Sequence, residues 1–172
     1  MKKAMKVLLF IILALLIIFI VISIYYLRLI FPPRPSVNDM QKLYEENKSA
    51  IHQIADTFAG IEFETVYILS PYEDYHYVSV TRDGSMAERY EYNNEATYDS
   101  FNTLFDGGIT GPIQKTDNYI MFQCWSTRDS GCGMVYSLDG KTPEIDKEFV
   151  AKEQIFEPLE DEGWYYYYSK IL

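Results

Sequence analysis

The sequence predicts an α+β protein: a single N-terminal transmembrane helix, then one amphipathic helix packed on an antiparallel β-sheet. Three observations lead to this fold class. A long uncharged apolar run opens the chain, a stretch of helical periodicity follows it, and the remainder consists of short strand-like segments separated by tight turns. No part of the chain has the strand–helix–strand spacing that a parallel sheet requires, so we expect antiparallel strands.

The apolar run covers residues 7–27 and contains no charged side chain. As a helix it would be roughly 32 Å long, which is enough to cross the hydrocarbon core of a bilayer. Tyr25 and Tyr26 near its end suit the membrane interface, where amphipathic rings are enriched. We therefore predict a transmembrane signal anchor over 7–27, preceded by a cytoplasmic N-terminus over 1–6.

Positive charges predict the orientation of this anchor. Three lysines and the α-amino group precede the run, two arginines follow it, and positive charge is retained on the cytoplasmic side. The sequence thus predicts a single-pass protein of a bacterial cytoplasmic membrane, with its N-terminus inside and its C-terminal domain outside, in the periplasm or the extracellular space. A cleaved signal peptide is the alternative, but its apolar region is usually about 7–15 residues and ends in a small-x-small site.

Residues 36–172 are expected to form a soluble acidic α+β domain, separated from the anchor by a proline-rich spacer over 28–35. From residue 35 onward the chain carries all 25 Asp and Glu but only 10 of the 15 Lys and Arg, a net charge of −15. Such a surface repels phosphate groups, so no nucleic acid partner is expected. A basic protein partner fits this charge, and an acidic surface that only keeps the domain soluble is the alternative.

Two helices are predicted in this domain. Apolar side chains recur at helical spacing over about 37–58, with Ser36 and Asp39 suited to a capping box and Gly60 to the C-terminal end. A shorter helix is predicted over 96–105, where the glycines that follow end it. We expect the apolar stripe of the longer helix to pack on the sheet.

The strands are predicted from period-two alternation and from the turn residues between them. Residues 127–133 are expected to form a tight polar loop, and residues 145–156 fit a short helix loosely. The expected strands cover residues 61–69, 75–81, 85–92, 113–114, 118–126, 134–138 and 164–168.

The two cysteines, Cys124 and Cys132, are candidates for a disulfide, which an oxidising compartment outside the membrane would permit. The closed loop is short, so the expected entropic stabilisation is about 2.5 kcal/mol. Two thiols are the alternative. The spacing of the pair, without neighbouring Cys or His, does not match a zinc site, and no metal is expected.

No catalytic residue and no cofactor are expected. His52 and His76 lack partners at metal-binding spacing, and Ser130 and Cys132 have no nearby base in the sequence. The chain also lacks the Gly-x-Ser-x-Gly motif and a phosphate-binding glycine loop. The sequence therefore favours a protein that binds a partner over one that catalyses a reaction.

Two stretches supply the candidate partner-binding residues. Trp125, Arg128 and Asp129 lie in or beside a short glycine-containing loop, and loops carried by a rigid sheet often bind partners. In the last strand, alternation places Trp164 and Tyr166 on one face, where exposed rings would anchor a protein or stack on a sugar. The alternatives are a hairpin loop without a partner and a strand buried between sheet and helix.

Together these features favour a membrane-anchored extracytoplasmic binding domain, with a basic protein as its partner. An immunity-type protein that neutralises an exported toxin is one concrete form of this function. A cell-envelope glycan-binding or glycan-hydrolysing protein, using the aromatic rings and carboxylates, is the main alternative. A role in assembling a membrane complex through helix contacts is weaker, because the apolar run has few small residues.

Overall fold

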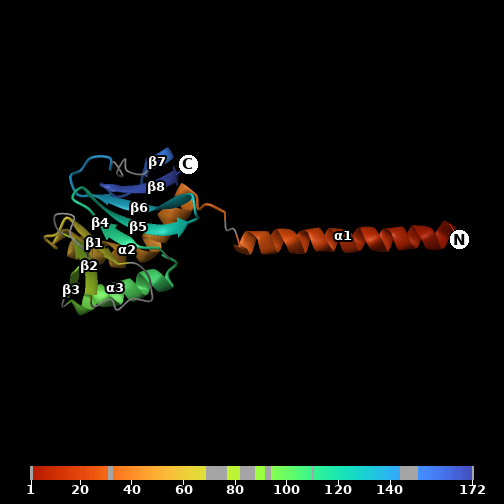
Figure 1. Cartoon of the computed structure of the whole chain (residues 1–172), viewed down its shortest axis with the longest axis horizontal. Coiled ribbons are helices and arrows are strands. Elements are labelled where there is room, and N and C mark those ends of the chain that lie inside the picture. Colours follow the sequence, from red (N-terminus) through yellow and green to blue (C-terminus); the bar gives the residue numbers. More distant parts are fainter. Residues whose placement is uncertain are drawn as a thin grey trace. The chain divides into compact units, whose positions relative to one another are not determined.

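In the computed structural model the chain divides into two compact units, Met1–Arg34 and Pro35–Leu172. Within the described residues, the first unit holds helix α1 (Lys2–Ile30), and the second holds two helices and an eight-stranded antiparallel sheet (Figure 1). The predicted α+β class is therefore confirmed for the second unit. The structure describes residues 2–30, 33–68, 77–81, 88–91, 94–109, 111–143 and 151–171.

Helix α1 is uniformly apolar over most of its length. Its segment Phe10–Leu27 has a mean hydropathy of 3.0 over 18 residues, and none of it is buried inside the structure. This helix is long and apolar enough to cross a membrane, a property that signal sequences share. The predicted N-terminal apolar helix is thus present.

Helix α2 (Val37–Ala59) begins at the predicted capping box. The Asp39 backbone N–H donates to Ser36 Oγ (3.2 Å), and the Ser36 backbone N–H donates to the Asp39 carboxylate (2.8 Å). The Ser36 hydroxyl also donates to this carboxylate (2.7 Å), and the hydroxyl and backbone bonds from Ser36 lower the pKa of Asp39. Gly60 caps the other end, as predicted. The buried apolar residues of the helix are Met40, Tyr44, Ala50, Ile51, Ile54, Ala55 and Phe58.

Helix α3 (Glu95–Asp106) confirms the second predicted helix. It begins at Asn94, whose side chain accepts a hydrogen bond from the Thr97 backbone N–H (3.3 Å). Its residues Phe101 and Leu104 are fully buried. The helix packs against α2, so it completes the helical layer.

Asn47 interrupts the apolar pattern of α2 because the helix meets the end of α3 there. Its side chain is buried and donates to the Leu43 carbonyl (2.9 Å). A Cβ at Gly107 would lie 2.5 Å from Asn47 Oδ1, so the glycine lets the two segments approach closely. The polar residue is thus a packing contact rather than a break in the helix.

The sheet has the strand order β3-β2-β1-β4-β5-β6-β8-β7, and all neighbours pair antiparallel. The last two strands do not follow chain order in the sheet, because β8 lies between β6 and β7. The strands are β1 (Thr65–Ile68), β2 (Tyr77–Thr81), β3 (Glu88–Glu91), β4 (Ile113–Lys115), β5 (Tyr119–Ser126), β6 (Ser130–Ser137), β7 (Ala151–Pro158) and β8 (Trp164–Ile171).

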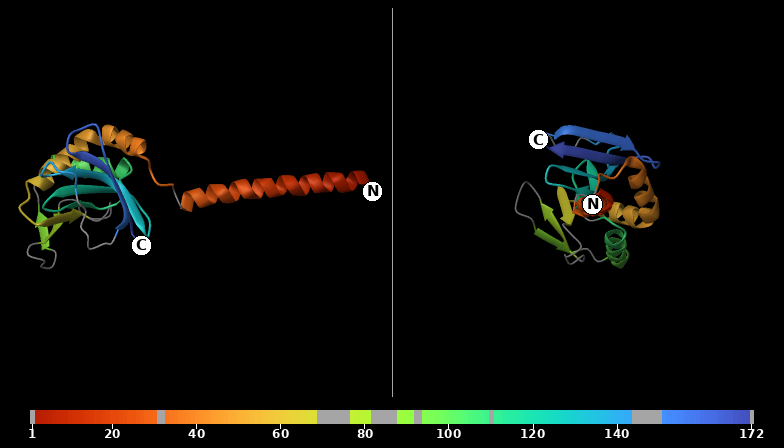
Figure 2. Two further views of the ribbon diagram at one scale, coloured as in Figure 1. Left: turned by 90° about the horizontal axis from the view of Figure 1, so that it is seen from above. Right: turned by 90° about the vertical axis from the view of Figure 1, so that its right-hand side faces the viewer.

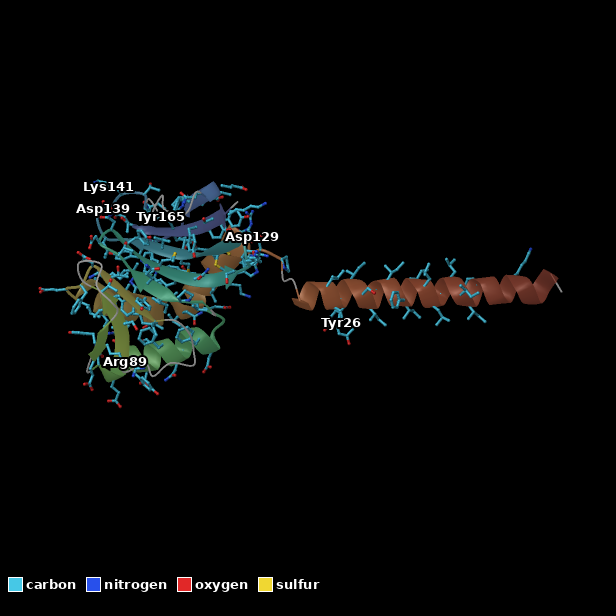
Figure 3. All side chains as sticks on the ribbon, in the orientation of Figure 1. Tyr26, Arg89, Asp129, Asp139, Lys141 and Tyr165 are labelled. Atoms are coloured by element: carbon cyan, nitrogen blue, oxygen red, sulfur yellow. The ribbon has the colours of Figure 1, made fainter. Side chains whose placement is uncertain are left out.

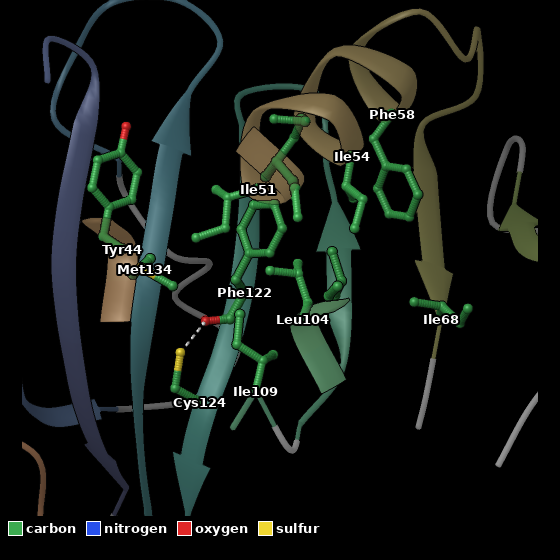
Figure 4. Close-up of a cluster of buried hydrophobic side chains, with 14 of the residues drawn as sticks. Tyr44, Ile51, Ile54, Phe58, Ile68, Leu104, Ile109, Phe122, Cys124 and Met134 are labelled. Carbon is green, nitrogen blue, oxygen red and sulfur yellow. Dashed lines mark hydrogen bonds between the residues drawn. The ribbon is translucent and has the colours of Figure 1, made fainter. Parts of the chain in front are cut away.

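Both helices of this unit lie on one face of the curved sheet (Figure 2). The main core fills the space between them, and Figure 4 shows side chains of α2 pointing towards Phe122 and Ile68 of the sheet. The opposite face carries a smaller buried cluster of Tyr119, Val135 and Tyr167. The sheet is therefore apolar on both sides near β5, β6 and β8.

The predicted polar loop over 127–133 is wrong, because β6 already begins at Ser130. Its glycines serve close approach rather than a turn. A Cβ at Gly133 would lie 2.0 Å from the Phe122 carbonyl oxygen, and one at Gly131 would lie 2.8 Å from the Gln123 side chain. Glycine within a strand often marks such a close contact. In the sequence alone, the same glycines look like those of a loop.

Residues 145–156 fit a short helix only loosely in the sequence, and residues 151–156 belong instead to strand β7; residues 145–150 lie outside the described residues. Ile155 packs on the main core, whereas the adjacent Phe156 packs on the cluster of the opposite face. Since both faces are apolar here, the strand does not show the usual alternation of apolar and polar residues.

The first predicted strand is shorter than expected. Residues 61–64 precede β1, and Lys115 Nζ donates to the carbonyls of Ile61 and Phe63 in that connection. Burial lowers the pKa of Lys115. The strands predicted over 113–114 and 164–168 are confirmed and lie within β4 and β8. Those predicted over 118–126 and 134–138 match β5 and part of β6 except at residues 118 and 138. Strands β2 and β3 match the described parts of 75–81 and 85–92.

Candidate functional site

The β5–β6 hairpin ends in a short turn that carries Arg128 and Asp129. The Thr127 backbone N–H donates to the Ser130 carbonyl (2.7 Å), and the two hydroxyl oxygens lie 2.8 Å apart. Both turn side chains are exposed. Figure 3 shows Asp129 at the end of the sheet opposite Lys141. This fixed turn presents Arg128 and Asp129 to solvent.

Trp125 lies closer to the core than the turn residues do. A β-bulge between Gln123 and Trp125 shifts the strand register, so Trp125 pairs with Cys132. The Trp125 side chain is half-buried and packs on the main core. Its Nε1 is buried and has no hydrogen-bond acceptor among the residues that the structure describes. The ring is therefore mainly a packing element, unlike the exposed turn.

Trp164 and Tyr166 lie in the core on the side of the helices, each 2% exposed. The Trp164 ring centroid is 5.2 Å from that of Tyr44 and 4.9 Å from that of Tyr136. The Tyr166 hydroxyl donates to the Pro35 carbonyl (3.3 Å). The structure thus does not bring these two rings together with Arg128 and Asp129 on one surface. It matches the buried-strand alternative for this stretch.

Cys124 and Cys132 are both buried and carry thiols. The Cys124 thiol donates to the Phe122 carbonyl at 3.5 Å (Figure 4). Burial, with a smaller effect of Cys132, raises the pKa of Cys124 well above its usual range. The structure therefore contains the thiol form of the pair, and a neutral thiol in this environment is a poor nucleophile.

A polar cluster that the sequence analysis did not identify joins α2 to the turn between β7 and β8. Asp161 Oδ2 accepts a hydrogen bond from the Tyr44 hydroxyl (2.6 Å) and pairs with Lys48 Nζ (2.7 Å). His52 Nε2 lies 2.7 Å from the Tyr44 hydroxyl oxygen and 3.6 Å from Asp161 Oδ2. We call Tyr44, Lys48, His52 and Asp161 the turn-anchoring cluster.

Within this cluster the negative charge of Asp161 is paired with the positive charge of Lys48. Burial, followed by the bond to Asp161, raises the pKa of Tyr44, so the phenol stays neutral. The bonds from Lys48 and Tyr44 lower the pKa of Asp161, and the bond to Asp161 raises the pKa of Lys48. The hydrogen bond from Tyr44 and the ion pair with Lys48 fasten the turn that carries Asp161 to helix α2.

The lowered pKa of Asp161 predicts a pH-dependent loss of stability. A lowered pKa in the folded state stabilises the protein above the ordinary value of 3.8, and this contribution disappears as pH falls through the folded-state pKa. We expect Asp161→Asn to unfold at lower urea than the wild type at about pH 7, with the difference vanishing well below pH 3.8. Urea unfolding at both pH values measures this, and Glu162→Gln is the matched control. A difference that is independent of pH would contradict the assignment.

The remaining lysines with described contacts are also engaged within the domain. Lys42 pairs with Glu46 (3.7 Å), Lys141 pairs with Asp139 (3.4 Å), and Lys115 is buried. By contrast, several exposed carboxylates of α2, α3 and the adjoining segments have no cationic partner among the described residues. They are Asp56, Glu62, Glu64, Glu91, Glu95, Asp99 and Asp106.

Comparisons with family models, with curated proteins and with solved structures find no match for this chain. Within the described residues, no group of three or more His, Cys, Asp or Glu side chains is placed to hold a metal ion.

Proposed function

We propose that this protein is a single-pass membrane protein that presents an acidic binding domain outside the cytoplasmic membrane, where the domain binds a basic protein. The charge distribution is the observation that carries this proposal. The second unit has a net charge of −15, and its Lys42, Lys48, Lys115 and Lys141 are held in internal contacts. The exposed carboxylates are left to attract a cationic partner.

The proposed membrane topology has α1 as an uncleaved signal anchor with its N-terminus inside the cell. Its support is the exposed apolar segment Phe10–Leu27, together with the excess of positive charge before that segment. The anchor would keep the domain beside the outer surface of the membrane, where it meets exported or incoming proteins. Neutralisation of an exported basic toxin by an immunity-type protein is one concrete form of this function.

Capture of the partner from detergent-solubilised membranes tests the proposal. Tagged full-length protein is expected to retain a basic protein at about 0.05 M salt and to lose it at about 0.5 M, because screening weakens charge attraction. A variant with Glu62, Glu64, Glu95 and Asp99 replaced by their amides should bind more weakly, with Gln53→Ala as an uncharged control. Retention that is insensitive to salt, or the absence of any captured protein, would refute the proposed function.

A further inference from the structure

One edge of the sheet is strand β7, whose central residues pair in regular register with β8. Of the two edge strands, β7 has eight residues and β3 has four. A bulge between Ala151 and Glu153 and the proline at Pro158 lie at the two ends of β7. Between them, residues 153–157 pair regularly with β8 on one side. The other side of an edge strand offers backbone N–H and C=O groups to a further strand.

The side chains of this stretch have a definite charge pattern. Ile155 packs on the main core and pairs with Tyr168, so it lies on the helix-facing side of the sheet. Because strand side chains alternate, Glu153 and Glu157 lie on that same side. Both carboxylates are exposed, and Ile155 between them is half-buried. One face of β7 therefore presents an apolar residue flanked by two carboxylates, of which Glu153 pairs in register with Lys170 of β8 and Glu157 with Tyr166.

We propose that the edge of β7 is the surface to which the basic partner binds, by adding an extended segment as a further strand of the sheet. This inference rests on the proposed function and names the part of the domain that carries it. The backbone groups of β7 supply the hydrogen bonds, and the side chains select the sequence. The segment that fits has an apolar residue opposite Ile155 and a Lys or Arg two positions away on each side, opposite Glu153 and Glu157.

The charge pattern disfavours a second copy of this chain as the added strand. Antiparallel self-pairing centred on Ile155 would place Glu153 of each copy directly opposite Glu157 of the other, and like charges opposite each other are destabilising. Two domains that each carry a charge of −15 also repel. The same carboxylates thus reject self-association and favour a cationic strand.

A synthetic peptide tests the edge directly. The probe is acetyl-Thr-Lys-Thr-Val-Thr-Lys-Thr-amide, added to the full-length protein in detergent micelles. We expect the peptide to slow hydrogen exchange of the amides within residues 153–157, and a peptide with Glu in place of Lys to have no effect. Affinity, followed by fluorescence anisotropy of a labelled peptide, should fall about tenfold in the variant Glu153→Lys/Glu157→Lys.

Two matched variants make the test specific. Glu45→Lys/Asp117→Lys changes the net charge equally, but these two exposed residues lie on α2 and in the turn between β4 and β5, so the effect on affinity should be about twofold or less. Glu153→Gln/Glu157→Gln removes the charges without reversing them and should give an intermediate affinity. Equal weakening by both charge reversals, or exchange protection outside β7, would overturn the edge proposal. So would dimerisation through β7 in sedimentation experiments without peptide.

The membrane capture experiment separates this proposal from the proposed function. If Glu153→Lys/Glu157→Lys still captures a salt-sensitive basic protein as well as the wild type does, the edge assignment fails while the proposed function stands. If neither protein captures such a partner, the proposed function itself fails. Loss of capture in the edge variant alone supports both.

Discussion

Replacing Leu15 and Ile18 by arginine is expected to release the protein from membranes. Both side chains are exposed and lie near the middle of the apolar segment Phe10–Leu27. An arginine at the centre of a transmembrane helix costs about 2.5–3.5 kcal/mol on insertion scales, so the double change costs roughly 5–7 kcal/mol. Carbonate extraction and ultracentrifugation should find the wild type in the pellet and the double variant in the soluble fraction.

The control for this experiment keeps the helix apolar. Leu15→Val/Ile18→Val should remain in the pellet, because valine is also favourable in the bilayer. The intact mass of the wild-type protein tests the anchor in a second way. A mass that corresponds to cleavage after the apolar segment would show that α1 is a signal peptide. Either that mass or a soluble wild type would refute the proposed anchor.

Trp164→Ala is expected to cause the largest loss of stability in the folded unit. The ring is 2% exposed and lies within 6 Å, between centroids, of Tyr44, His52, Phe122 and Tyr136. Truncation of a buried tryptophan to alanine typically costs about 3–5 kcal/mol through lost burial and a residual cavity. The free energy of unfolding of a typical domain is about 5–15 kcal/mol, so this loss is a large fraction of it.

Urea unfolding, followed by circular dichroism, measures this loss. Tyr90→Ala is the matched control, because Tyr90 is 38% exposed on the edge strand β3 and should cost about 1 kcal/mol or less. If Trp164→Ala and Tyr90→Ala cost the same, Trp164 would not have the central position in the core that the structure gives it.

Local signals in the sequence were sufficient to predict the helices and most strands. The capping box at Ser36 and Asp39 and the apolar face of α3 depend on residues within a few positions of one another, and both are present. The start of β6 was missed because Gly133 is required by the approach of the Phe122 carbonyl from the neighbouring strand. A single sequence does not reveal such a contact.

The candidate site was less predictable than the fold. Tyr44, Lys48 and His52 recur every four residues on α2, which indicates one shared face. Their partner Asp161 lies 117 residues beyond Tyr44, so only the folded sheet brings it to that face. Similarly, Trp164 and Tyr166 alternate as a strand should, but whether their side of the strand is covered depends on where α2 packs.

The position of β8 between β6 and β7 has a consequence for how the protein is made. The sheet stays divided until residue 171 has been synthesised, and Trp164 and Tyr166 reach the core only with that strand. In the proposed topology the N-terminus stays inside the cell, so completion of the fold must follow translocation of nearly all of the second unit. Nascent chains that stop before β8 would expose apolar surface to quality-control proteases.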